Sequence, residues 1–424
     1  MVLRKGVTMN KKILSLSQQA RVRNEWLEYR LANILPRLME RTGIDMWVVI
    51  AREYNEDPVM GSLFPAPVMT ASRLTGLVFS YKKQKGLECF SLYPEESGML
   101  SPYYTPVWKK GQETQWERLN ELICEKKPEV IGIDTSEKFA LADGLSKHLY
   151  DQFVGCLTEE YRRRLTSAED LVVGWLETRS DRELQVYPGI NNIIHSIIAE
   201  AFSNEVIDVG VTTTADVEWW MMEKAASLGL NPWFPFDVDL QREGEKNTRM
   251  TGEVIRPGDL LRCDVGIDYL GLKTDTQRLA YVLKINENDA PEGMKTALGT
   301  GNRFQDIVCE QFAEGKTGNE ILLAALKQAE TENIKAELYT HPIGVHGHGA
   351  GPTIGLWDNQ KGVSGRGDYP LYTDTCYALE LNIAQNLPEW NNQELRICLE
   401  QTVAFRDGQV FYLDGRQTDF LLIR

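Results

Sequence analysis

Carboxylates placed inside short apolar segments are the feature that most limits how this chain can fold. Asp264 lies within the apolar run 259–267, and Glu380 lies near the centre of the run 377–383. Burying a lone carboxylate in such a strand is unfavourable unless it finds a cation or hydrogen-bond donors. A stable fold must therefore bring distant segments together so that these side chains share partners.

Five potential metal ligands follow one another in the last third of the chain: Asp264, Asp275, His341, Glu380 and Glu400. Residues 269–272 suit a turn, so the first two carboxylates can lie on neighbouring strands. Four carboxylates and one imidazole can hold two adjacent divalent cations around a water of lowered pKa. The order predicts a dinuclear metal site, although each carboxylate alone would equally fit an ion pair with a nearby arginine such as Arg262 or Arg278.

The segment 341–352 is rich in glycine and contains three of the five histidines, namely His341, His346 and His348. Imidazole suits Zn, Fe, Co and Mn, whereas carboxylates favour harder ions. A loop with solvated histidines is the competing interpretation of this segment alone. A phosphate-binding loop is disfavoured because no Gly-Lys-Ser/Thr follows the glycines.

Length and composition limit the class of protein. A chain of 424 residues suits two domains, and its formal net charge of −15 disfavours nucleic acid as a partner. The seven cysteines include no CxxC pair, which favours a reducing compartment. The apolar run at 13–16 is too short for an export signal, and no run reaches the length of a membrane span. We therefore expect a cytoplasmic protein without a membrane partner; an exported form whose signal was removed stays open.

Periodicity predicts two domains of different class. Residues 1–166 read as a smaller α/β domain, and residues 167–424 read as helices packed on an antiparallel sheet, an α+β core. In the first domain we expect helices at 18–42 and 142–153 and strands at 45–51, 74–81, 87–93 and 130–134. In the second we expect helices at 171–176, 190–202, 216–226, 301–313 and 318–330, with strands at 259–267, 277–285, 336–340, 376–383, 395–405 and 409–413.

The ligand order resembles that of the pita-bread metallopeptidases, which include methionine aminopeptidase, aminopeptidase P, prolidase and creatinase. The resemblance covers roughly residues 170–424, and the preceding domain resembles the amino-terminal domain of aminopeptidase P and prolidase. It rests on two aspartates eleven residues apart, His-x-x-Gly with a second histidine seven residues after the first, and two glutamates in strands.

The resemblance implies a role for each matched residue. Asp264 matches a ligand of one metal, Asp275 and Glu400 match bridging carboxylates, and His341 and Glu380 match ligands of the second metal. His348 matches the histidine that contacts substrate near the scissile bond. Glu380 would also move a proton from water to the leaving amine, and His346 would assist.

The implied activity is that of an Xaa-Pro aminopeptidase or dipeptidase, in which a metal-bridged hydroxide attacks the peptide carbonyl. The implied cofactors are two divalent ions, with Mn favoured by the carboxylate-rich set and Co, Zn or Fe as alternatives. The implied partners are a small proline-containing peptide and a second copy of the chain in a homodimer.

Three departures from the family pattern keep other functions open. The stretch 231–237 lacks the family's upstream histidine, Leu381 stands where the family has proline, and Cys398 and Leu399 are two extra residues before Glu400. The alternatives are a non-peptidase enzyme on the same fold, such as a dimethylsulfoniopropionate lyase or a creatinase-like amidinohydrolase, and a non-catalytic binding protein that retains the metal site.

Overall fold

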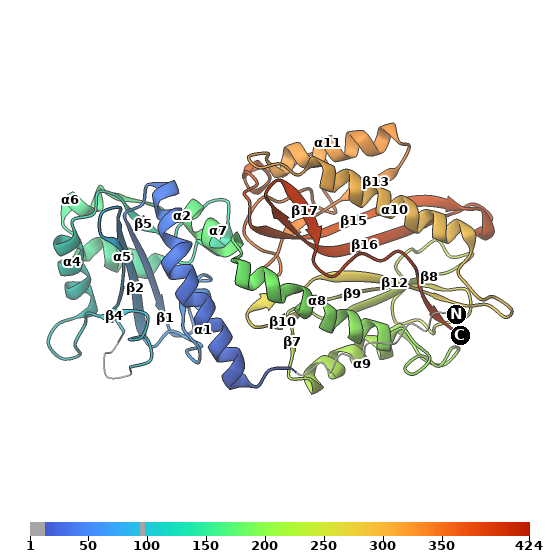
Figure 1. The fold of residues 1–424 in the computed structure, drawn as a ribbon, viewed down its shortest axis with the longest axis horizontal. Coiled ribbons are helices and arrows are strands. Elements are labelled where there is room, and N and C mark those ends of the chain that lie inside the picture. Colours follow the sequence, from blue (N-terminus) through green and yellow to red (C-terminus); the bar gives the residue numbers. More distant parts are fainter. Residues whose placement is uncertain (1–12, 94–97) are drawn as a thin grey trace.

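The structure is a computed structural model that describes residues 13–93 and 98–424. Two large sheets lie at opposite ends of an elongated molecule (Figure 1). The first has six strands and belongs to the amino-terminal part, and the second has nine strands and belongs to the carboxyl-terminal part. Within the described ranges, no helix combines the length and apolar character that crossing a membrane requires.

The six-stranded sheet forms around the apolar run at its centre. All residues of β1 (Met46–Arg52) except the last are buried. The strand order is β4 (Thr105–Pro106), β3 (Gly86–Ser91), β2 (Leu74–Lys82), β1, β5 (Ile131–Ile133) and β6 (Leu165–Ser167).

Helices cover both faces of this sheet, which makes it a three-layer α/β unit. On one face the core includes side chains of α4 (Gln115–Lys126) and α5 (Lys147–Cys156). On the other it includes side chains of α1 (Leu16–Asn33), α2 (Leu35–Thr42) and α7 (Glu169–Glu177).

Three expectations for this half need correction or stay open. The helix predicted at 142–153 begins only at Lys147, because Ser146 before it has an extended backbone; residues Ala140–Ala142 form a separate 3-10 turn. The predicted helix at 18–42 is two helices, which meet at Ile34 before Pro36. The domain boundary at residue 166 stays a prediction, and it falls within the last strand of the first sheet.

The nine-stranded sheet supplies the surface on which the predicted ligands lie. Its main path is β13, β15, β16, β12, β9 and β8, and three short strands pair with its members. The bounds are β8 (Asp237–Gln241), β9 (Leu260–Val265), β12 (Thr276–Val282), β13 (Lys335–Leu338), β14 (His341–Pro342), β15 (Thr375–Leu387), β16 (Gln393–Arg406), β17 (Gln409–Tyr412) and β18 (Leu421–Ile423). A small third sheet joins β7 (Asn231–Pro232), β10 (Ile267–Tyr269) and β11 (Leu272–Lys273).

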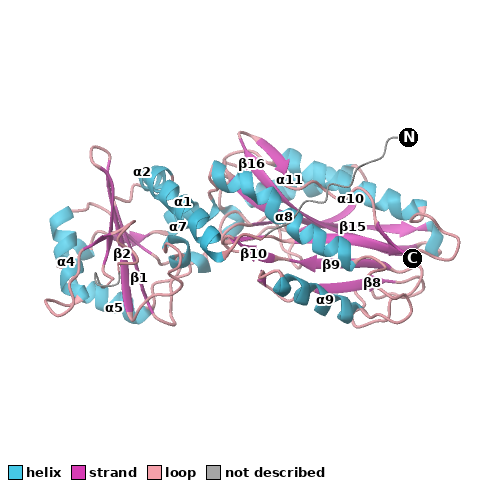
Figure 2. Cartoon of the chain, turned by 60° about the horizontal axis from the view of Figure 1, so that its bottom comes forward, coloured by secondary structure: helices cyan, strands magenta, loops and turns pink. Residues whose placement is uncertain are grey.

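Four helices cover the apolar side of the larger sheet. One core joins α8 (Asp181–Ala201) and α9 (Thr214–Ser227) to β8 and β9, and another joins α10 (Glu292–Gln311) and α11 (Gly318–Thr331) to β15 and β16. Figure 2 shows these helices running along the strands. The α+β architecture predicted from sequence is confirmed in this half.

The register of this sheet places polar residues of five strands in one transverse row. Glu380 of β15 lies opposite Glu400 of β16, Glu400 lies opposite Gln277 of β12, and Gln277 lies opposite Asp264 of β9. Asp264 in turn lies opposite Asp237 of β8. Directly opposed residues point to the same face of a sheet, so the row gathers carboxylates that are up to 163 positions apart on a single surface.

Candidate metal centre

All five predicted ligands converge on the polar face of the larger sheet. Three groups have ligand atoms that all lie within 4.8 Å of one another, and every predicted ligand belongs to at least one group. The groups are His341 with Glu380 and Glu400, Asp264 with Asp275 and Glu400, and Asp275 with His341 and His348. Glu400 belongs to two carboxylate-containing groups, as a bridging ligand would.

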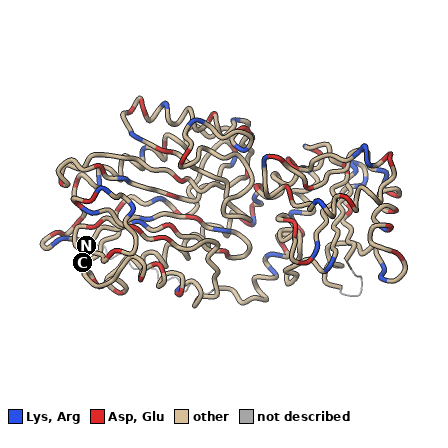
Figure 3. Tube along the Cα trace, turned by 180° about the vertical axis from the view of Figure 1, so that it is seen from behind, with Lys and Arg blue, Asp and Glu red and all other residues tan. Residues whose placement is uncertain are grey.

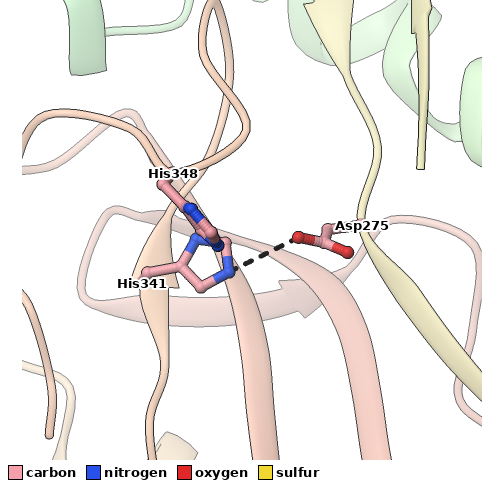
Figure 4. A group of neighbouring side chains, drawn as sticks. All are labelled: Asp275, His341 and His348. Carbon is pink, nitrogen blue, oxygen red and sulfur yellow. Dashed lines mark ion pairs between the residues drawn. The ribbon is translucent and has the colours of Figure 1, made fainter. Parts of the chain in front are cut away.

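Several ligand atoms are buried without the partners that buried polar atoms normally have. Both Oε atoms of Glu400, Oδ1 of Asp275 and Nε2 of His341 make no hydrogen bond of ordinary geometry to any described residue. Nε2 of His341 lies 3.5 Å from Oδ2 of Asp275, the contact drawn as a dashed line in Figure 4. The same nitrogen lies 3.7 Å from Oε1 of Glu400. Oxygen-rich ligands with one imidazole and orphaned lone pairs fit divalent cations.

The electrostatics of the carboxylates agree with this fit. Burial raises the pKa values of Asp275, Glu380 and Glu400 well above the ordinary range, and the neighbouring carboxylates raise them further. Burial also raises the pKa of Asp264, partly offset by Arg262. In the absence of cations these groups therefore retain protons that an unfolded chain would release.

His341 differs from the other two histidines of its loop. Burial lowers the pKa of His341, but Glu400 and Glu380 beside it more than compensate and raise it overall. Burial lowers the pKa values of His346 and His348 to about 4, with help from Lys273 beside the first and from His341 beside the second. Both are therefore neutral near pH 7.

The structure brings His348 to the ligands but leaves His346 outside the three ligand groups. The rings of His341 and His348 lie edge to face with centroids 4.7 Å apart. Nδ1 of His346 is buried and unpartnered among the described residues, and the side chain lies beside Lys273 and Arg179. A catalytic role of His346 stays a prediction with less geometric support than that of His348.

Two polar residues hydrogen-bond to the proposed ligands, and only one of them, Arg262, was considered from the sequence. Gln277 donates from Nε2 to Oε1 of Glu380 at 2.6 Å, and Arg262 donates from a terminal nitrogen to Oδ2 of Asp264 at 3.2 Å. Strand alternation after Asp275 is a signal that places Gln277 on the same face. The ion pair of Arg262 with a carboxylate, which the sequence left open as an alternative to metal binding, is present, and Arg396 donates to Glu337 at 2.9 Å.

An aromatic surface adjoins His348. The indole of Trp233 donates from Nε1 to the carbonyl of Thr274 at 2.7 Å, and its ring lies 5.3 Å from that of His348 and 4.4 Å from that of Phe234. Gly347 is required beside it, because a Cβ there would lie 2.3 Å from the indole ring. The indole is half-buried, so a molecule bound near His348 would meet an apolar wall.

Two other tryptophans differ from Trp233 in their surroundings. Trp390 is buried in the core beneath α10 and α11, and Trp357 is 76% exposed. Of the three, Trp233 is the one in ring contact with a site residue.

The described residues carry charges of both signs in both halves of the molecule (Figure 3). Lys and Arg alternate with Asp and Glu along both halves of the described chain (Figure 3).

Comparison with known proteins assigns the fold to one family. The model of Metallopeptidase family M24 matches residues 190–407, a range that includes all five predicted ligands. No curated protein sequence matches the chain.

Solved structures match over nearly the full length. An X-Pro aminopeptidase from Thermotoga maritima MSB8 has a TM-score of 0.66 at 14% identity, covering 91% of this chain and 99% of its own. An Xaa-Pro dipeptidase from Bacillus anthracis has a TM-score of 0.61 at 15% identity, covering 95% and 99%. A prolidase from Pyrococcus furiosus has a TM-score of 0.58 at 16% identity, covering 90% and 99%. At these identities the likeness shows a shared fold.

Proposed function

The chain belongs to Metallopeptidase family M24, and we propose that it is a dinuclear Xaa-Pro peptidase, acting as an aminopeptidase or a dipeptidase. The observation that carries the proposal is the convergence of five ligands with unpartnered buried atoms on one sheet face. The printed names of the solved relatives, X-Pro aminopeptidase, Xaa-Pro dipeptidase and prolidase, support the proline specificity.

The ligand groups divide naturally between two cations. Asp264, Asp275 and Glu400 would hold one, and His341, Glu380 and Glu400 would hold the other, with Asp275 close enough to His341 to bridge. Four carboxylates and one imidazole favour Mn(II) among the candidate ions. Bound there, the ions would polarise a substrate carbonyl and lower the pKa of a coordinated water.

The protein's own residues supply the proton transfers. Glu380 is held by the amide of Gln277, and its raised pKa suits a group that accepts a proton from water and returns it to the leaving amine. His348 is neutral near pH 7 because its pKa is about 4, so it can donate a hydrogen bond to the substrate without adding a charge.

The aromatic wall supports a substrate with an apolar ring. Trp233 is fixed by its hydrogen bond to Thr274, and together with Phe234 it offers a rigid surface next to His348. A pyrrolidine ring packs well against an indole face, and burying it removes apolar area from water.

The test is a peptide panel read together with metal content. Protein stripped with chelator and reloaded with Mn, Co, Zn or Fe should cleave Xaa-Pro peptides faster than matched Xaa-Ala peptides. His348→Ala should retain metal but lose most turnover, because His348 is not among the five residues proposed to hold the two cations, whereas the exposed Asp358→Asn should change neither.

The same panel separates the alternatives. Absence of Xaa-Pro turnover with all four metals, in protein that binds them, would contradict the proposal. Release of a non-peptide product would favour a lyase or amidinohydrolase, and metal binding without any turnover would favour a binding protein.

A further inference from the structure

A buried guanidinium lies directly beside the candidate metal centre. The side chain of Arg262 is 7% exposed and points from β9 onto the same face as the ligands. One terminal nitrogen donates to Oδ2 of Asp264 at 3.2 Å and to Oε1 of Gln277 at 3.0 Å. Arg262 therefore contacts one proposed ligand and, through Gln277, a second one.

Two aspartates of β8 hold the guanidinium in this position. Its Nε and its other terminal nitrogen donate to Oδ2 of Asp239 at 3.0 and 2.6 Å, and the latter nitrogen also donates to Oδ2 of Asp237 at 2.9 Å. The side chain of Asp239 is 2% exposed. These bonds fix the plane of the guanidinium, so its approach to Asp264 is part of the fold and not a surface contact.

The positive charge of Arg262 is permanent. Burial alone would lower its pKa, but Asp239 and other neighbours more than compensate and raise it overall. A guanidinium does not release its proton in proteins, so no change in pH within the working range removes this charge.

The two cation positions are consequently unequal. At the position formed by Asp264, Asp275 and Glu400, one oxygen of Asp264 already accepts from Arg262, and an incoming cation meets a fixed positive charge. At the position formed by His341, Glu380 and Glu400, the hydrogen bonds from Arg262 through Gln277 favour cation binding, because Gln277 holds Oε1 of Glu380 in place.

We propose that Arg262 is a positioning residue that weakens cation binding at the Asp264 position while orienting Glu380 for the other. The two positions then fill in a fixed order, first beside His341 and then beside Asp264. This inference rests on the proposed dinuclear function. It means that occupancy of the position beside Asp264 depends on the metal concentration.

Arg249 offers a matched control for the variant Arg262→Met. It also pairs with Asp237 and with Asp239, the latter at 3.1 Å, but it makes no contact with Asp264 or Gln277 among its hydrogen bonds to described residues. Arg249→Met thus removes one positive charge from the same aspartates without freeing an oxygen of the ligand.

The experiment is a calorimetric titration of the chelator-treated full-length protein with MnCl₂. We expect two binding steps in the parent, and we expect Arg262→Met to tighten the weaker step by at least roughly tenfold, since it removes an adjacent charge at low effective dielectric. Arg249→Met should shift that step much less. A parent that binds one ion while Arg262→Met binds two would support the same conclusion.

An unchanged or weakened second step in Arg262→Met would overturn the inference, as would equal tightening in Arg249→Met. If Arg262→Met does not fold, Arg262→Gln keeps an amide donor for Asp239 while removing the charge, and the same outcomes apply. Visible absorption of Co(II)-loaded protein gives a second readout, because the coordination at the weaker position changes when Oδ2 of Asp264 becomes free.

Peptide turnover of the same samples separates the two proposals. Xaa-Pro cleavage by the parent without a metal-binding change in Arg262→Met would remove this inference alone. A tightened second step in a protein that cleaves no peptide would leave it standing and remove the proposed function.

Discussion

Replacing Asp275 by asparagine should stabilise the metal-free protein and destabilise the metal-loaded protein. Asp275→Asn exchanges a carboxylate for a neutral group of the same shape at the position that both cations would share. Without cations the change removes like-charge repulsion from a buried cluster, and with cations it removes a ligand. The sign of the effect should therefore reverse on metal binding.

The magnitude follows from the spacing of the carboxylates. The ligand atoms of Asp264, Asp275 and Glu400 lie within 4.8 Å of one another. Two unit charges at that spacing repel by about 3 kcal/mol at an effective dielectric constant of 20. Because the folded protein avoids part of this repulsion by retaining protons, we expect Asp275→Asn to raise the metal-free unfolding free energy by about 1 to 3 kcal/mol at pH 7.5. Losing one cation site costs the loaded protein about 2.7 kcal/mol at a free metal concentration of 100 Kd.

The pH dependence has a definite sign. The pKa of Asp275 is raised in the folded state, so the folded chain binds a proton that the unfolded chain has released once the pH exceeds the ordinary aspartate value. Stability from this group is present at low pH and is lost as the pH rises. The metal-free parent should thus lose stability between pH 5 and pH 8, and Asp275→Asn should show a shallower loss.

The assay is urea unfolding at pH 5 and pH 8, in excess chelator and in excess MnCl₂. The exposed Asp358→Asn serves as the control for removing one negative charge. A metal-free Asp275→Asn protein that is less stable than its parent at both pH values would refute the reasoning, because it would mean that Asp275 has a stabilising partner other than a cation.

Three further substitutions test other parts of the structure. Burial raises the pKa of Glu177 to about 8, so the stability that this group contributes is present below the ordinary glutamate pKa and is lost as the pH rises through about 8. Glu177→Gln should therefore raise the free energy of unfolding at pH 8.5 by on the order of 3 kcal/mol, as measured by urea unfolding. Trp233→Leu should raise KM for Xaa-Pro peptides several-fold and leave calorimetric Mn affinity unchanged, whereas the exposed Trp219→Leu should alter neither. Gln277→Leu should lower kcat by roughly tenfold with little change in KM, since Glu380 loses the donor that orients it; an unchanged kcat would show that Glu380 needs no such support.

The convergence of the proposed ligands follows in part from the sequence, because burial makes an unpartnered carboxylate costly. Asp264 and Glu380 interrupt apolar strands, and that interruption is visible without any structure. The hydrogen-bonding partners of these carboxylates were not predictable, because the sequence of one strand does not show which residue of the neighbouring strand lies opposite. Strand alternation gives the face of Gln277, but only the register of the sheet places Gln277 and Asp237 on either side of Asp264.

The predicted start of one helix was wrong because glycines near its beginning hide its helical character in the sequence. The helix predicted at 301–313 begins nine residues earlier, at Glu292. Gly293, Gly299 and Gly301 lie inside it and lower its apparent helical propensity. Two of them are packing positions: a Cβ on Gly301 would lie 2.9 Å from Leu399, and one on Gly293 would lie 2.3 Å from Glu389. Close contact of this helix with the sheet therefore outweighs the local preference.

The departures from the family pattern near Glu380 and Glu400 have no consequence for the ligands. Strands β15 and β16 pair continuously from Thr375 opposite Phe405 to Leu387 opposite Gln393, and Glu380 lies opposite Glu400 within that run. The two extra residues, Cys398 and Leu399, are paired like their neighbours, and an insertion of two preserves the face to which every later side chain points. Leu381 points to the opposite face, where it is fully buried with α10 and α11. An insertion of one residue would instead have turned Glu400 into the helical core, so the even number is what keeps the metal centre compatible with the changed sequence.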